Sequence, residues 1–111
     1  LQAAHRRAGV FVNPADYEAC PLSLLEAMAM GTPIVTTPVG FVGQLPEPRP
    51  LTVVEADPAP IAIAIEAALA APAAMHARAI RARRLVEAHF SWDRVAAIVA
   101  AAYRGLARTA A

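Results

Sequence analysis

The chain has 111 residues, of which 58% are hydrophobic, and its ten basic and nine acidic side chains give a formal net charge of +1. This length suffices for one domain with a core, and the small charge argues against a nucleic-acid binder that depends on electrostatics. All apolar runs are far shorter than the ~20 residues of a membrane span, so we expect a soluble protein without an opening signal peptide. The single cysteine, Cys20, cannot form an internal disulfide, which fits a cytoplasmic location.

The first third of the chain has the pattern of a strand, a loop and a helix. Residues 10–12 form a short apolar run, as expected of a strand buried on both faces of a parallel sheet. A polar loop that contains proline follows over residues 15–21. We expect a helix over about 21–30, with Pro21 suited to its first turn and Gly31 to its C-terminal stop. The side chains expected on its inner side are Leu22, Leu25, Met28 and Ala29.

Two more strands are predicted, over residues 33–37 and 51–54, where β-branched and apolar side chains gather. The segment between them, residues 38–50, is rich in proline and glycine and is expected to be a loop. Strands that alternate with helices imply right-handed crossovers and a parallel sheet covered on both faces. The predicted fold class is therefore α/β.

The rest of the chain is predicted to be helical, over residues 58–71, 73–89 and 91–108, with Ser91 as the cap of the last helix. Three arginines recur on one side of the second of these helices, which favours a solvated face, although a membrane surface could also use it. These arginines are Arg78, Arg81 and Arg84. The side chains expected to face inward or to pack are Ile61, Ile65, Leu69, Ile80, Leu85, Val86 and Trp92.

The loop after the first strand is the place where this fold would bind a ligand. In open parallel sheets, ligands lie outside the carboxyl ends of the strands, and a helix start offers free amide donors for phosphate or sugar oxygens. A carboxylate can accept hydrogen bonds from two neighbouring hydroxyls of a ribose or a hexose. Glu18 and Glu26 flank this helix start, so loop and helix predict a cradle for a nucleotide sugar.

The same residues resemble a known family. Residues 10–14 (VFVNP), Tyr17-Glu18 and residues 21–35 (PLSLLEAMAMGTPIV) are similar to the donor-binding signature of the retaining family-4 glycosyltransferases, which have the GT-B fold. The similarity extends over nearly the whole chain. It implies a Rossmann-like parallel sheet with flanking helices, in which residues 1–111 form the second half of the C-terminal, donor-binding domain. The N-terminal acceptor domain would then be absent.

The resemblance also implies roles for single residues. Glu18 would be the catalytic residue that lies beside the transferred sugar, contacts its hydroxyls and stabilises the charge that develops at the anomeric carbon. Glu26 would hold the two ribose hydroxyls. No metal, other cofactor or catalytic base is implied. The full set of implied substrate-binding residues is Glu18, Ala19, Cys20, Pro21, Leu22, Ser23 and Glu26.

Three departures from the family pattern bear on the site. Ala19 and Cys20 stand where the family usually has Gly-Phe or Gly-Leu, so the turn must avoid a glycine-only conformation or accept strain. Residues 41–47 replace the second glycine, proline and glutamate that usually follow the glycine matching Gly40. The arginine and lysine that neutralise the donor diphosphate belong, in the family, to a segment upstream of this chain.

Several alternatives remain at this point. Ser23 and Glu26 also match a capping box, and Glu18 could be a solvated loop acid. The preferred function is transfer of a hexose from a nucleotide-diphosphate sugar to a sugar, lipid or small-molecule acceptor, with the rest of a GT-B enzyme as partner. The alternatives are a degenerate GT-B domain that serves as a scaffold or regulatory partner, and a nucleotide-sugar epimerase of the same fold.

Overall fold

The computed structural model describes residues 2–109 and contains a parallel sheet of three strands in the order β1-β2-β3. In the register, Val35 of β2 lies between Val12 of β1 and Thr52 of β3. The predicted α/β class with a parallel sheet is therefore confirmed, and each strand lies within one or two residues of its predicted range. The bounds are β1 Phe11–Asn13, β2 Ile34–Thr36 and β3 Thr52–Val53.

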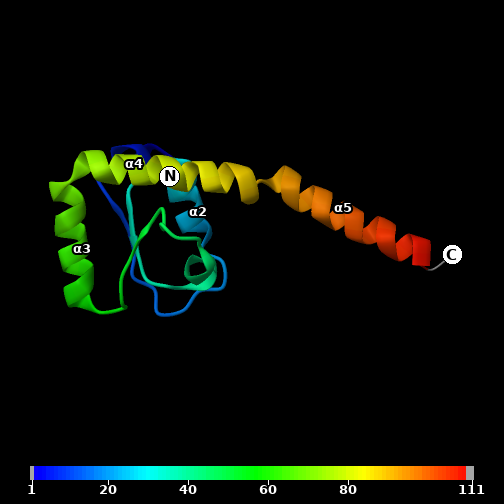
Figure 1. Cartoon of the computed structure of the whole chain (residues 1–111), viewed down its shortest axis with the longest axis horizontal. Helices are drawn as coiled ribbons and strands as arrows, with labels where there is room; N and C mark the ends of the chain where they lie inside the picture. Colours follow the sequence, from blue (N-terminus) through cyan, green and yellow to red (C-terminus); the bar gives the residue numbers. More distant parts are fainter. Residues whose placement is uncertain (1, 110–111) are drawn as a thin grey trace.

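Helices lie between these strands and follow the last of them (Figure 1). The last three begin and end within one residue of the sequence prediction. Proline marks the starts of α3 and α4, while the side chains of Asp57 and Ser91 cap α3 and α5, since they accept hydrogen bonds from the amides of Ala59 and Arg94. A first helix was not predicted, and a short 3-10 helix lies in the segment that was expected to be a loop. The bounds are α1 Gln2–Arg7, α2 Leu22–Ala29, the 3-10 helix η1 Gly40–Gln44, α3 Pro58–Ala70, α4 Pro72–His89 and α5 Trp92–Thr109.

Apolar clusters cover both faces of the sheet. On one face, Ile34 packs with side chains of α2, η1 and α4, among them Leu24 and Val42. On the other face, the next residue of β2, Val35, packs against Ala64 and other side chains of α3 and α4. Figure 1 shows the strands between α2 and α3. Since successive side chains of a strand point to opposite faces, this arrangement explains why β2 is buried throughout.

The helices bury their small side chains, which corrects part of the predicted core. Ala64 and Ala68 of α3 are buried, whereas Leu69, which was expected to face inward, is 58% exposed. On α4, Ile80 is exposed, while Met75, Ala79 and Ala82 are buried. Alanine lets a helix approach the sheet closely, so the longer side chains lie at the margins of the contact.

The last helix, α5, extends away from the rest of the molecule (Figure 1). The radius of gyration is 16.6 Å, whereas a compact domain of this length has about 13 Å. Trp92 was expected to pack, but its side chain is 81% exposed. Other apolar side chains of α5 are exposed as well, namely Val95, Ile98, Val99 and Tyr103. A row of apolar side chains at helical spacing is typical of a helix that is covered by another surface.

The three arginines of α4 do not share one solvated face. Arg78 is half-buried, and its Nη1 donates a hydrogen bond of 2.8 Å to the hydroxyl of Thr52 on β3. Arg81 and Arg84 are exposed, as predicted. No single helix within residues 2–109 has the length and apolarity to cross a membrane, and only two consecutive helical segments, bent by 103°, pass that test together.

Gly31 ends α2 in the left-handed conformation, with φ of 68°, as the sequence predicted. The amides of Gly31 and Thr32 donate to the carbonyls of Met28 and Ala27, at 3.0 Å each, which is the Schellman pattern. No atom lies within 4 Å of the Cβ that an alanine would add, so a substitution is penalised by backbone conformation alone. We therefore expect Gly31→Ala to lower the free energy of unfolding by about 1 kcal/mol.

Urea denaturation of the wild-type chain, Gly31→Ala and Gly31→Asn measures this difference. Asparagine tolerates the left-handed region better than alanine does, so Gly31→Asn should lose less stability. Equal stability of the alanine variant and the wild type would contradict the prediction.

Candidate functional site

The loop that joins β1 to α2, residues 14–21, begins above the carboxyl ends of the strands. The residue that follows β2, Thr37, holds its beginning: the amide of Thr37 donates to the carbonyl of Asn13 at 3.1 Å, and its hydroxyl donates to the carbonyl of Ala15. Asn13 and Thr37 are both buried. The β1–α2 loop is therefore fixed to the neighbouring strand at the edge of the sheet where ligands bind in this fold class.

The other end of the β1–α2 loop is the start of α2. Pro21 is the buried N-cap residue, its side chain makes no capping hydrogen bond, and its carbonyl accepts from the amide of Leu24 at 3.1 Å. Within residues 2–109, the amides of Leu22 and Ser23 have no hydrogen-bond partner. Because Ser23 lies inside the first turn and not at the N-cap, the capping box with Glu26 is excluded. Two free amides at a helix start can bind an anionic oxygen.

Glu18 lies in the middle of this loop and is half-buried. Its Oε2 atom is shielded from solvent and has no hydrogen-bond partner among the described residues. A buried acceptor without a partner costs about 1–3 kcal/mol, so this geometry disfavours the alternative of a simple solvated acid. The catalytic role of Glu18 stays a prediction.

Neither predicted acid is neutralised within the described part of the chain. The ion pairs there join Arg49 to Glu47 and Arg83 to Glu87, with closest distances of 2.9 and 2.8 Å. Glu18 and Glu26 belong to neither of these pairs. Across residues 2–109, no group of three or more His, Cys, Asp or Glu side chains could hold a metal ion.

The turn that departs from the family pattern is not strained. Ala19 and Cys20 are exposed, and no residue other than glycine has a positive φ in the described chain. Of the two alternatives considered for this turn, it therefore avoids the glycine-only conformation. The exposed thiol of Cys20 carries no disulfide.

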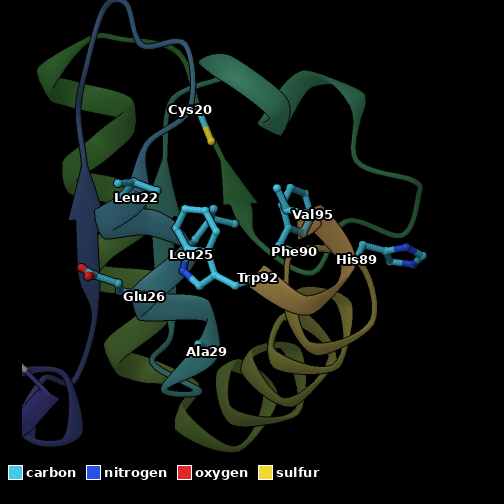
Figure 2. A pocket seen from close by; sticks show the side chains of 9 residues that line it. All are labelled: Cys20, Leu22, Leu25, Glu26, Ala29, His89, Phe90, Trp92 and Val95. Atoms are coloured by element: carbon cyan, nitrogen blue, oxygen red, sulfur yellow. The ribbon is translucent and has the colours of Figure 1, made fainter. Parts of the chain in front are cut away.

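A cavity of about 470 Å³ lies between α2 and the junction of α4 with α5 (Figure 2). The thiol of Cys20 points toward it, whereas the carboxylate of Glu26 points away from Trp92 and Phe90. The residues that line the cavity are Cys20, Leu22, Leu25, Glu26, Ala29, His89, Phe90, Trp92 and Val95. Three predicted site residues, Cys20, Leu22 and Glu26, thus border the cavity.

The other predicted site residues lie outside this cavity. Glu18 and Ala19 belong to the β1–α2 loop, while Pro21 and Ser23 lie at the start of α2. Leu22 was expected in the core but is 63% exposed, and Glu26, one helical turn later, is exposed as well. Residues four apart share one helix face, so this face of α2 is open to a ligand or to another part of the protein.

The far wall of the cavity was not predicted from the sequence. It consists of Phe90, Trp92 and neighbouring residues at the α4–α5 junction, where the ring of Phe90 also packs against Phe41 of η1 at 5.0 Å between centroids. The sequence feature that could have indicated this wall is the pair of aromatic residues, Phe90 and Trp92, that flank Ser91. They indicate an interruption between two helices, but not which surface the rings would form.

Comparisons with known proteins point to one family. The family model described as "Glycosyl transferases group 1" matches residues 1–71. The chain is 36% identical over 105 residues to glycogen synthase from Mycobacterium tuberculosis, in both strain CDC 1551 / Oshkosh and strain H37Rv. This match covers 93% of the chain and 25% of the relative. The chain therefore spans about a quarter of the length of these curated relatives.

A solved structure gives the same result at the level of the fold. Sucrose-phosphate synthase from Thermosynechococcus elongatus superposes with a TM-score of 0.83 and 33% sequence identity. The match covers 92% of this chain and 26% of that protein. Sequence signature, sheet topology and superposition agree on a GT-B enzyme. The chain belongs to the group 1 glycosyltransferases, the family whose donor-binding signature is similar to residues 10–14, 17–18 and 21–35.

Proposed function

We propose that the chain binds the nucleotide-sugar donor of a retaining glycosyltransferase, which transfers a hexose to a separate acceptor. The observation that carries this proposal is the arrangement of polar groups at the carboxyl ends of the strands. There Glu18 has a buried oxygen without a partner, and the same loop leads to the free amides of Leu22 and Ser23 at the start of α2. A sugar hydroxyl would donate to Glu18, and diphosphate oxygens would accept from the two amides. The relatives are named for glycogen and sucrose phosphate, both carbohydrates, which favours a hexosyl donor.

This activity requires more than the present chain. A nucleoside diphosphate brings about two negative charges, and helix amides contribute only about 0.3–1 kcal/mol when exposed. We therefore propose that basic residues elsewhere in a longer GT-B polypeptide bind the diphosphate. Two features support this proposal: β1 is an edge strand within the described residues, and the apolar side of α5 is exposed. We also propose a cytoplasmic location, supported by the free thiol of Cys20.

Thermal unfolding of the full-length enzyme with a panel of nucleotide sugars tests the donor class. A ligand at 100 times its dissociation constant stabilises the folded protein by about 2.7 kcal/mol. We expect one nucleotide diphosphate hexose to raise the melting temperature more than the free hexose or the nucleoside monophosphate does. The absence of a shift with every nucleotide sugar would refute donor binding.

The product that forms from the bound donor distinguishes a transferase from an epimerase and from a degenerate domain. Transfer predicts a new glycoside whose anomeric configuration, measured by NMR, is that of the donor. An epimerase would change the sugar of the donor without any acceptor. Tight binding without either product would indicate a degenerate domain with a scaffold or regulatory role.

A further inference from the structure

Gly40 lies directly against the turn that follows Glu18. It is the first residue of η1 and has φ of 55°, a backbone conformation that residues with a side chain rarely adopt. A Cβ atom at this position would lie 2.6 Å from the carbonyl oxygen of Ala19 and 3.1 Å from Cδ of Pro21. Both atoms belong to backbone or to a proline ring, so neither can rotate away as the end of a flexible side chain could.

This contact lies between the two fixed ends of the β1–α2 loop. At one end, Thr37 holds the carbonyls of Asn13 and Ala15. At the other end, Pro21 is buried as the N-cap of α2. Thr37 and Gly40 both belong to the segment that follows β2, so one segment supports the β1–α2 loop both at its start and at its turn. The part of the loop that can still shift is the part that carries Glu18 and Cys20.

The buried residues that follow Gly40 hold the backbone of η1 in place. The side chain of Val42 is fully buried in the core, and Leu45, which follows η1, is also buried. The amide of Leu45 donates to the carbonyl of Val42 at 3.2 Å. A side chain added at position 40 would therefore displace the exposed turn at Ala19 more easily than it would displace η1.

We propose that Gly40 is a positioning residue for Glu18: because it lacks a side chain, the turn at residues 18–20 can lie directly against η1, which fixes the carboxylate relative to the donor sugar. The contact itself is independent of any ligand, whereas its consequence for catalysis rests on the proposed function. Gly43, in the same 3-10 helix, is the control for the steric contact, since a Cβ there would meet its nearest atom, the carbonyl oxygen of Pro38, at an ordinary 4.0 Å. Gly31 is the control for the backbone conformation, since it has φ of 68° but no atom within 4 Å of an added Cβ.

The thiol of Cys20 reports on the turn without any ligand. It is exposed, follows Ala19 directly and is the only cysteine of the 111-residue chain. We expect Gly40→Ala to change the rate of its reaction with Ellman's reagent about threefold or more, while Gly43→Ala and Gly31→Ala change the rate little. Circular dichroism and the melting temperature show that the variants are folded. An unchanged rate in folded Gly40→Ala would overturn the proposal.

A double variant covers the case in which Gly40→Ala does not fold. Ala19→Gly lets the peptide plane after residue 19 rotate, so that its carbonyl can move away from the new methyl group. We expect Ala19→Gly/Gly40→Ala to fold and to react at a rate that differs from that of Ala19→Gly alone. Equal rates, or failure of the double variant to fold, would show that Gly40 serves the fold as a whole and not the turn.

Activity of the full-length enzyme tests the link to Glu18. Gly40→Ala should lower kcat about tenfold in the wild-type background and much less in the Glu18→Gln background, because residues that act through one group are not additive. Additive losses would overturn the positioning role even if the thiol rate changed. If no nucleotide sugar is a substrate, the proposed function fails, and the thiol experiment still decides whether Gly40 holds the turn.

Discussion

Glu18→Gln is expected to lower kcat of the full-length glycosyltransferase by about 10²–10³-fold, the loss typical for removal of one group that stabilises charge in a transition state. Glutamine keeps the shape of the side chain and one oxygen acceptor but removes the negative charge. Since the Oε2 atom of Glu18 is buried and lacks a partner in the described chain, the folded protein should not be destabilised by the change. The affinity for the donor should fall only slightly, because the charge matters most when positive charge develops at the anomeric carbon.

Steady-state kinetics and donor binding, measured on the same preparations, separate these effects. Glu66→Gln is the matched control. Glu66 is exposed on α3, and its replacement removes the same charge at a position outside the site. We expect wild-type kcat for this control. A kcat within threefold of the wild type in Glu18→Gln would show that Glu18 has no catalytic role.

The sequence predicted the parts of the fold that depend on local signals. Pro21 and Gly31 bracket α2 because proline fits a helix start and glycine fits the left-handed residue after a helix end. The β1–α2 loop was predicted at the carboxyl ends of the strands, where the structure has it. The resemblance identified the family, which the comparisons confirm over most of the chain.

The errors concern surfaces that only tertiary contacts decide. Helical spacing cannot tell whether Leu22 faces the core or an open face of α2, because both alternatives have the same period. In the same way, Trp92 was expected to pack, whereas in the structure its exposed side chain lies at the start of α5 and borders a cavity. The contact of Gly40 with Ala19 joins two loops 21 positions apart, and no local pattern encodes such an approach.

Replacement of Glu26 separates ligand binding from folding more cleanly than replacement of Glu18. Glu26 is exposed, its carboxylate points away from Trp92 and Phe90 (Figure 2), and it belongs to no ion pair within residues 2–109. Alanine is a good helix former, so Glu26→Ala should leave the melting temperature without ligand unchanged. If the carboxylate binds the ribose, the dissociation constant of the donor should rise about 10–100-fold, as expected for loss of hydrogen bonds to a charged group.

A donor that lacks the 2′-hydroxyl makes this prediction specific to the ribose. The wild-type enzyme should bind the 2′-deoxy nucleotide sugar about tenfold more weakly than the ribose form, whereas Glu26→Ala should bind both forms with nearly equal affinity. Calorimetric titration of both proteins with both donors completes the cycle. If Glu26→Ala still distinguished the two donors by a factor of ten, another residue would hold the 2′-hydroxyl, and Glu26 would act on the donor only through its charge.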